Sequence, residues 1–332
     1  MRVLRIWRYV CAAFVAAVSI AGCGAGGSAG PPMPAAPAAS VGRSTFAHFA
    51  HAGSWFRHDS SSGGDLVYMA EGENIGIYSF AGKEVGELKG FESSYSSGLC
   101  SDMQGNVWAA YEDSLLEYQR GGTIPVAQLY TPGNPTSCAV DPATGDIAVT
   151  EQSNASGSNV AVFSGIYAAP AIYTDPDIFY YEFSTFDSQG NLFVNGVGPK
   201  KNHSVLAELL KGGSTLGTVT TDEKFEKVGG LQWDGQDLAN GDSERHVIYE
   251  MSVASGHATT VGTIKLGGWI NSRFKVIEPF AIGNGQIVLT ISDRQTGFYK
   301  YPAGGKSIRR LPITTGAKTI SLAPSGLRKE NK

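Results

Sequence analysis

The chain has 332 residues, with 26 Lys and Arg against 30 Asp and Glu, so its formal net charge at pH 7 is −4. Proteins that bind nucleic acid carry concentrated positive charge, and this chain has no such excess. The composition therefore argues against a nucleic-acid partner. The chain is also rich in glycine, with 43 residues, which indicates many tight turns.

Residues 1–22 have the order of a secretory signal peptide. Three Arg residues within the first eight give a cationic start, and Val10–Ile20 is apolar but too short to span a bilayer. The segment Ile20-Ala-Gly-Cys23 resembles the bacterial lipobox, in which cleavage precedes the Cys and the sulfur receives a diacylglycerol. The resemblance implies an exported bacterial lipoprotein with Cys23 as its lipidation site. The alternative is a plain secretory signal with a chance Cys.

The lipobox resemblance also implies a location. An acylated Cys carries more than one chain, which is enough for stable membrane anchoring. Gly24 stands where inner-membrane lipoproteins carry Asp, so we expect an outer-membrane anchor facing the periplasm or the exterior. Cleavage leaves 23 basic against 30 acidic residues, a net charge of −7. Residues 23–64, which begin with a stretch of Gly, Ala, Pro and Ser, are predicted to be a flexible tether.

A short phrase recurs along the rest of the chain: an apolar run, an Asp, a Gly-centred turn and a second apolar run. Strong copies lie at Gly98–Ala110, Ser137–Val149 and Phe183–Val194, and weaker copies at Leu231–Ala239 and Phe280–Leu289. The Asp residues of the first four copies are 39, 46 and 47 residues apart. This period is typical of a four-stranded propeller blade.

The two ends of the repeat region complement each other. Three strand-like runs lie between Leu66 and Leu88 without the first run of a unit, and Lys318–Ala323 is a spare first run. Pairing the spare run with Leu66–Ala70 would complete a sixth blade and remove exposed sheet edges. We therefore predict an all-β, six-bladed β-propeller with four-stranded blades over residues 65–325, followed by a tail at 326–332. A flat sandwich is the rival fold.

The phrase Asp-x-x-Gly-Asn-apolar-aromatic-Val resembles NHL-repeat six-bladed β-propellers of exported bacterial proteins. It covers nearly all of the chain after the tether. The resemblance implies a fold, whereas propellers of this kind include protein-binding scaffolds, sugar-lactone hydrolases and lyases.

Two cysteines remain in the repeat region, in a compartment that favours oxidation. Cys100 precedes its repeat Asp by two residues and Cys138 by three. Successive side chains on a strand point to opposite faces, so the two thiols would face each other between adjacent sheets. A Cys100–Cys138 disulfide is one expectation, and two buried free thiols are the other.

No motif in the chain points to a catalytic residue. The repeated Asp residues are expected to accept backbone N–H bonds in turns rather than to bind metal. There is no EF-hand spacing, no His-Glu-x-x-His and no Gly-x-Ser-x-Gly. We therefore expect no cofactor and favour a protein that is not an enzyme.

Aromatic residues cluster just before the first run of each unit, at positions expected to surround one mouth of the propeller channel. Such rings suit sugar stacking or protein anchoring, although rings packed between blades are the alternative. The predicted ligand-binding residues are Tyr95, Tyr130, Tyr180, Tyr181, Phe225, Trp269 and Arg273, with Phe179 and Phe274 in the same segments.

Two carboxylates share one repeat position. Glu182 and Glu278 align with the small residues Ser97, Thr136 and Gly229 of the other units. A lactonase-like site would use such carboxylates to hold a divalent metal. Solvated charges at a funnel rim are the alternative.

These patterns lead to a prediction of function. We expect a lipid-anchored module of the bacterial cell envelope that binds a protein partner or a glycan at an aromatic channel mouth. A metal-dependent lactonase-like hydrolase and a structural scaffold of an envelope assembly are the alternatives.

Overall fold

The computed structural model describes residues 52–59, 63–91, 98–153, 157–199, 203–267, 279–292, 295–312 and 317–325. The chain divides into two units, Met1–Val41 and Gly42–Lys332, and every described residue belongs to the second. The predicted signal peptide, Cys23 and the tail at 326–332 therefore lie outside the described residues. In the described part, no helix has the length and hydropathy to cross a membrane.

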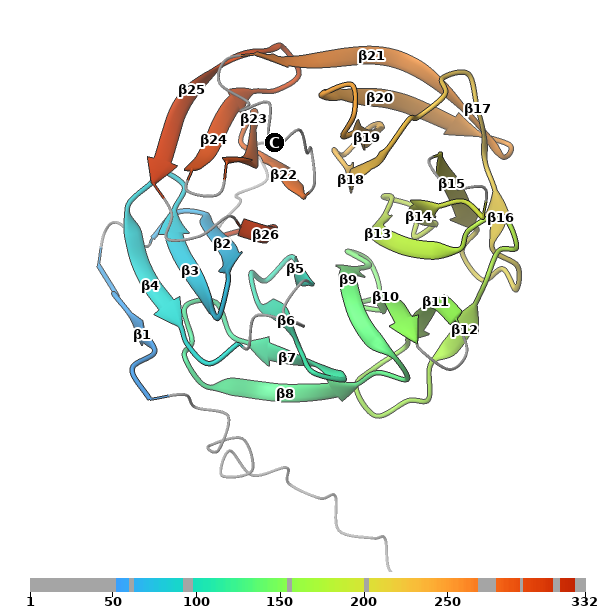
Figure 1. The fold of residues 1–332 in the computed structure, drawn as a ribbon. Coiled ribbons are helices and arrows are strands. Elements are labelled where there is room, and N and C mark those ends of the chain that lie inside the picture. The colour runs from blue at the N-terminus through green and yellow to red at the C-terminus, as the bar shows by residue number, and fades with distance from the viewer. Residues whose placement is uncertain are drawn as a thin grey trace, which may run out of the picture. The chain divides into compact units, whose positions relative to one another are not determined.

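Every described regular element is a strand, so the predicted all-β class is confirmed (Figure 1). Three antiparallel sheets have four strands each. Their strands are β5 (Leu99–Ser101), β6 (Val107–Tyr111), β7 (Ser114–Tyr118) and β8 (Pro125–Tyr130); β9 (Asn134–Val140), β10 (Ile147–Ser153), β11 (Gly157–Phe163) and β12 (Ala171–Tyr173); and β13 (Tyr180–Phe186), β14 (Leu192–Val197), β15 (Ser204–Leu209) and β16 (Gly217–Thr218).

A fourth sheet joins the start and the end of the described region. Its order is β1-β4-β3-β2-β26, with β26 antiparallel to β2 and Val67 opposite Leu322. The predicted pairing of the spare run Lys318–Ala323 with the run Leu66–Ala70 is thus confirmed. The strands are β1 (Trp55–Phe56), β2 (Leu66–Glu71), β3 (Asn74–Ser79), β4 (Glu84–Leu88) and β26 (Ala317–Ala323).

The remaining strands form one nine-stranded sheet rather than two separate four-stranded sheets, which corrects the expectation from the repeats. β21 and β25 pair in parallel at their outer edges, with Leu266 opposite Gly305. This pairing covers the outer edge of the eleven-residue β21 at Leu266 and Gly267, and β17 pairs with the same strand at His257 and Ala258. The strands are β17 (Thr220–Thr221), β18 (Val228–Trp233), β19 (Leu238–Asp242), β20 (Val247–Ala254), β21 (His257–Gly267), β22 (Phe280–Gly283), β23 (Gln286–Ser292), β24 (Gln295–Lys300) and β25 (Gly304–Pro312).

The boundary predicted between tether and folded region, at residue 64, is wrong. β1 lies within the predicted tether and pairs with β4, with Trp55 opposite Glu87. Its Phe56 packs against the first hydrophobic cluster and lies close to Gly121, in the turn between β7 and β8. The packing of Phe56 thus helps a two-residue strand to cover the outer edge of this sheet at β4.

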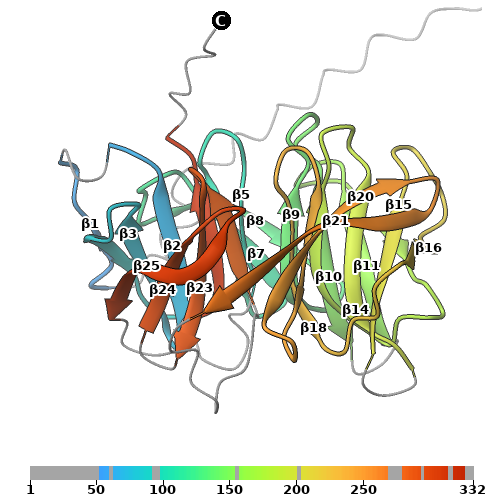
Figure 2. The same cartoon turned by 90° about the horizontal axis from the view of Figure 1, so that it is seen from above.

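Six four-strand sets follow the sequence repeats, namely β26 with β2–β4, β5–β8, β9–β12, β13–β16, β18–β21 and β22–β25. In Figure 1, strands β26, β5, β9, β13, β18 and β22 lie nearest a common centre, and we call them the inner strands. Most strands run between the same two ends of the unit (Figure 2).

The hydrophobic core lies between neighbouring strand sets. Among the described residues, six hydrophobic clusters each join two neighbouring sets. One of them contains Val67 and Met69 from the first set with Val288 and Phe298 from the sixth. Each set therefore buries its two faces against the sets before and after it, as expected for stacked repeats that cannot bury their apolar faces alone.

Candidate functional site

A cavity of about 410 Å³ lies among the inner strands, and we call it the central cavity. All six inner strands contribute to its wall. Its described lining comprises Asp65, 99–103, 137–140, Pro142, 183–186, 230–235, 279–283, 320–322 and Pro324. This volume lies within the range of about 300–1,000 Å³ that is usual for small-ligand pockets.

Two of the repeat Asp residues, Asp102 and Asp234, line the cavity at the end where the Asp turns lie, which we call the Asp-turn end. Asp102 accepts bonds at 2.8 Å from the backbone N–H and the side-chain amide of Asn106. Asp187 repeats this pattern with Asn191 at the same distances. In the described part of the chain, no group of three or more His, Cys, Asp or Glu is placed to hold a metal. The turn-capping role expected for these residues agrees with these bonds.

The other end of the cavity is marked by a row of β-bulges in the inner strands. The extra residue is Thr136 in β9 and Glu182 in β13, and β18 has its irregularity at Gly229 and Gly230. These are the positions that the repeat alignment made equivalent. In β9 and β13 the residues that line the cavity all follow the bulge residue, and in β18 the lining begins at Gly230, within the bulge.

Hydrogen bonds at the bulges tie the third set to the fourth and the fourth set to the fifth. The Thr150 hydroxyl donates to the Glu182 carbonyl at 3.1 Å, and the Asn195 amide donates to the Gly229 carbonyl at 2.9 Å. Both donors are fully buried, so these bonds satisfy polar groups that would otherwise be costly to bury. The repeat positions that the sequence alignment made equivalent therefore lie where hydrogen bonds join neighbouring sets, close to the inner strands.

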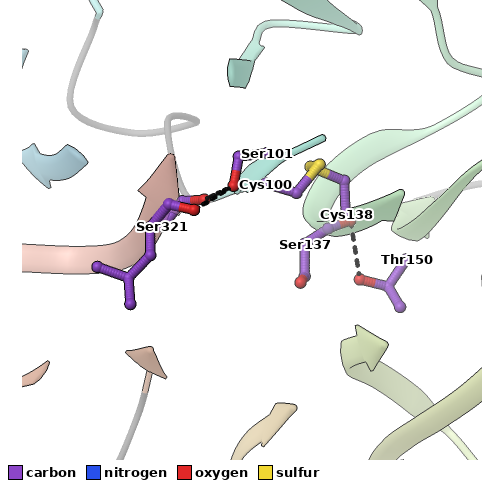
Figure 3. The surroundings of a disulfide bond; sticks show 7 residues. Cys100, Ser101, Ser137, Cys138, Thr150 and Ser321 are labelled. Carbon is purple, nitrogen blue, oxygen red and sulfur yellow. Dashed lines mark hydrogen bonds between the residues drawn. A yellow bond between two sulfur atoms is a disulfide. The ribbon is translucent and has the colours of Figure 1, made fainter. Parts of the chain in front are cut away.

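The structure contains the expected disulfide between Cys100 on β5 and Cys138 on β9, with Cα atoms 5.5 Å apart. It joins two neighbouring inner strands and lies in the wall of the central cavity. Figure 3 shows Ser101 and Ser321 pointing toward each other beside it, and their hydroxyl oxygens are 3.0 Å apart. The Ser101 hydroxyl also donates to the Leu322 carbonyl at 2.6 Å, which fastens β26 to β5.

Two predicted ligand-binding aromatics are not at any surface. Tyr181 is fully buried, and its hydroxyl bonds the backbone N–H of Asp175. Phe225 is also buried and packs edge-on against Tyr249. The expectation that these two rings face a channel mouth is wrong. Both rings fill the core between sets, which was the alternative for such rings.

Two other predicted aromatics are exposed. Tyr130 ends β8 and Tyr180 begins β13, with 67% and 44% of their surface open to solvent. Phe179 is 56% exposed, and its ring lies 4.4 Å from that of Tyr180 at an angle of 68°. Neither Tyr130 nor this Phe179–Tyr180 pair lines the central cavity, whose described lining extends to the Asp-turn end instead.

Of the remaining candidate residues, Glu182 alone belongs to the part of the chain that the structure describes. Tyr95, Trp269, Arg273, Phe274 and Glu278 lie outside the described residues. Glu182 is half-buried and is the bulge residue of β13. A metal site shared by Glu182 and Glu278 therefore stays a prediction.

Sequence reasoning missed a buried acid near the bulges. Glu151 on β10 is fully buried and faces the side-chain amide of Asn159 and the backbone N–H of Gly133. Burial raises the pKa of its carboxyl to about 7, against the opposing effect of these two donors. Its place two residues after the apolar run Ile147–Val149 of the same strand was the signal available in the sequence.

No known family profile matches the chain, and no curated protein matches it. Among solved structures, it is similar to a protein of unknown function from Bacteroides caccae, with a TM-score of 0.55 and 12% identity, over 78% of this chain and 99% of that chain. A luciferin-regenerating enzyme gives a TM-score of 0.48 and 12% identity, over 66% of this chain and 76% of that chain. At such low identity, the first likeness shows a shared β-rich fold, and the second carries no argument.

Proposed function

We propose that the chain is a lipid-anchored β-propeller of the bacterial cell envelope, with six blades that resemble NHL repeats. The six strand sets would be the blades, and the pairing of β26 with β2 would close the ring. The hydrophobic cluster between the sixth and first sets supports closure, because an open array would leave those two faces exposed. The β21–β25 pairing would then join the outer edges of blades five and six.

We further propose that this propeller is a binding module for a protein partner. The observation that carries the proposal is the exposed Phe179–Tyr180 pair, at the end of the unit where the inner strands begin. Partly exposed aromatic side chains of this size are enriched among the residues that contribute most to protein interfaces.

Backbone hydrogen bonds fix the position of the Phe179–Tyr180 pair. Phe179 donates its N–H to the Val197 carbonyl at 2.7 Å, so the backbone of the pair belongs to the sheet edge. The next residue, Tyr181, is fully buried, and its N–H donates to the Ser158 hydroxyl at 2.9 Å. Anchoring residues on such a rigid support lose little conformational freedom on binding.

The ring geometry favours a protein over a glycan. Sugars stack on one open, flat ring face, whereas the 68° angle of this pair makes a corner. A corner of two apolar rings fits an inserted side chain of a partner protein. A glycan ligand is therefore a possible outcome of the test, and not the expected one.

The experiment places a photo-reactive benzoylphenylalanine at position 180 of the full chain in native envelopes. The same residue at position 167 is the matched control, because Tyr167 is 78% exposed but belongs to the loop between β11 and β12. We expect one discrete protein adduct from position 180 and none from position 167. The double variant Phe179→Ser, Tyr180→Ser should then bind the purified partner at least about tenfold more weakly, with an unchanged melting temperature.

Three results would contradict the protein-binding proposal. One is an absence of any adduct at position 180, and another is an equal adduct at position 167. The third is a glycan adduct at position 180, which would replace the protein partner with a sugar ligand.

A further inference from the structure

The sixth strand set, β22–β25, carries only positive charge in its described residues. Lys300, Lys306, Arg309 and Arg310 belong to it and no Asp or Glu does, whereas each of the other five sets has described carboxylates. Arg309 packs within the fold, because its guanidinium carbon lies 3.8 Å from the centre of the Phe298 ring. Lys300, Lys306 and Arg310 are exposed. An acidic chain therefore presents a locally basic surface on this set.

Strand pairing adds Lys265 of the fifth set to this basic surface. Gly267 of β21 lies opposite Lys306 of β25. Paired residues point to the same face, and alternate residues along a strand share a face, so Lys265 and Lys306 lie on one face of the β21–β25 pair. Gly304 lies opposite Lys300, and a Cβ added to it would be 2.6 Å from the Lys265 carbonyl oxygen. The three lysines therefore come from neighbouring stretches of backbone.

We call Lys265, Lys300, Lys306 and Arg310 the outer basic surface, together with Ile308, which lies between the last two in the sequence. β21 and β25 belong to the outer wall of the folded unit (Figure 1). All four cations are exposed, and Ile308 is 49% exposed. The surface thus combines positive charge with one accessible apolar side chain.

The four cations of the outer basic surface have no acid to neutralise them. Within the described ranges, no carboxylate forms an ion pair with any of the four. Asp222 does lie against β21, but toward the other end of the strand, where it accepts bonds at 2.9 Å from the N–H and the hydroxyl of Thr260. Like charges gathered without a counter-ion repel one another and attract an anionic partner.

The composition of the outer basic surface favours a lipid surface over a protein. Protein interfaces are depleted in Lys, and three of the four cations are Lys. An anionic bilayer, in contrast, attracts each Lys or Arg that comes near it. The exposed alkyl group of Ile308 can enter the headgroup region between the flanking cations, as apolar side chains of interfacial segments do.

We propose that the outer basic surface contacts a bilayer that contains anionic phospholipid. The inference rests on the proposed lipid anchor only because that anchor would keep a membrane nearby. It involves neither the Phe179–Tyr180 pair nor the proposed protein partner.

The test follows the emission of an NBD label on the full-length protein mixed with lipid vesicles. The label is attached to Ile308→Cys, and NBD emission moves to the blue when the group enters lipid. Ile172→Cys is the matched control, because Ile172 is 50% exposed on β12, the outer strand of the third set. We expect a blue shift at position 308 on vesicles that contain phosphatidylglycerol, and a loss of this shift in high salt. Vesicles of phosphatidylcholine alone, or the label at position 172, should give no such shift.

Charge variants in the Ile308→Cys background check the role of the cations. Lys306→Gln with Arg310→Gln should lose most of the shift, because each cation near an anionic surface strengthens binding about fivefold. Lys211→Gln with Lys224→Gln removes the same charge from exposed positions outside the sixth set and should keep the shift. The proposal is overturned by the absence of a shift at position 308, by an equal shift at position 172 or on phosphatidylcholine alone, or by a shift that survives Lys306→Gln with Arg310→Gln.

The lipid anchor is judged separately on the unsubstituted chain. That chain should take up no label, because Cys23 would be acylated and Cys100 is bonded to Cys138. It should also float with vesicles of phosphatidylcholine alone. Labelling of Cys23, or a failure to float with these uncharged vesicles, would contradict the anchor, whereas the shift at position 308 would still decide the lipid contact.

Discussion

At the residue scale, Glu151 makes stability depend on pH. Its carboxyl is fully buried, and burial raises its pKa from an ordinary 4.5 to about 7. The unfolded chain therefore releases this proton at a lower pH than the folded protein does. Between pH 4.5 and about 7 the unfolded state binds fewer protons, so this residue lowers the free energy of unfolding as pH rises.

We expect Glu151→Gln to remove this dependence. The variant should match wild type near pH 4.5 and gain stability over it toward pH 8, by at most about 3 kcal/mol. Urea denaturation of both proteins across this range checks the prediction. A stability difference that stays constant with pH would show that the Glu151 carboxyl titrates normally in the folded protein.

Single residues were the hardest features to predict. Tyr180 and Tyr181 are neighbours of the same type, yet one is 44% exposed and the other is fully buried. Alternation along a strand requires them to point to opposite sides, but it does not say which side is covered. That choice depends on the neighbouring set, whose Ser158 accepts the Tyr181 N–H. Sequence spacing contains no information on this contact.

At the scale of elements, the disulfide joins β5 to β9 across two sets. Its cysteines are 38 residues apart, and in the chain-entropy account closing a loop of that length stabilises the fold by about 4 kcal/mol. We expect the double variant Cys100→Ser, Cys138→Ser to lose up to that amount of unfolding free energy, because the unfolded chain regains its freedom.

Denaturant unfolding with and without reductant checks this expectation. Wild type should lose stability when reductant is added, whereas the double Ser variant should not respond. Equal stability of wild type in both conditions would mean that the bridge is absent or contributes nothing to stability.

Strand positions were largely predictable, but the strands β1 and β17 and the β21–β25 pairing were not. The repeat phrase with its Gly turns located the strands of every set, because Asp and Gly are required by tight turns of this kind. β1 was not predicted because it has only two residues and follows a low-complexity segment. The β21–β25 pairing was not predicted because it joins the outer edges of two sets, where the sequence repeat contains no recurring residues.

At the scale of the whole folded unit, closure of the proposed ring depends on the pairing of β2 with β26. The β26–β2 ladder places the last strand in the sheet of β2–β4. One hydrophobic cluster joins this sheet to the sixth set, and the Ser101–Leu322 bond fastens β26 to β5. This much was predictable, because a missing strand at one end and a spare strand at the other can be seen in the sequence. The central cavity was not, because its wall combines short stretches from six distant strands.

The central claim is tested most directly by hydrogen exchange measured by mass spectrometry on the intact chain. Peptides covering 66–71 and 317–323 should exchange together in the slowest class, because the two strands share one ladder, as the proposed closed ring requires. Fast exchange in 317–323, at the rate of an unstructured peptide, with 66–71 still protected would contradict the closed ring.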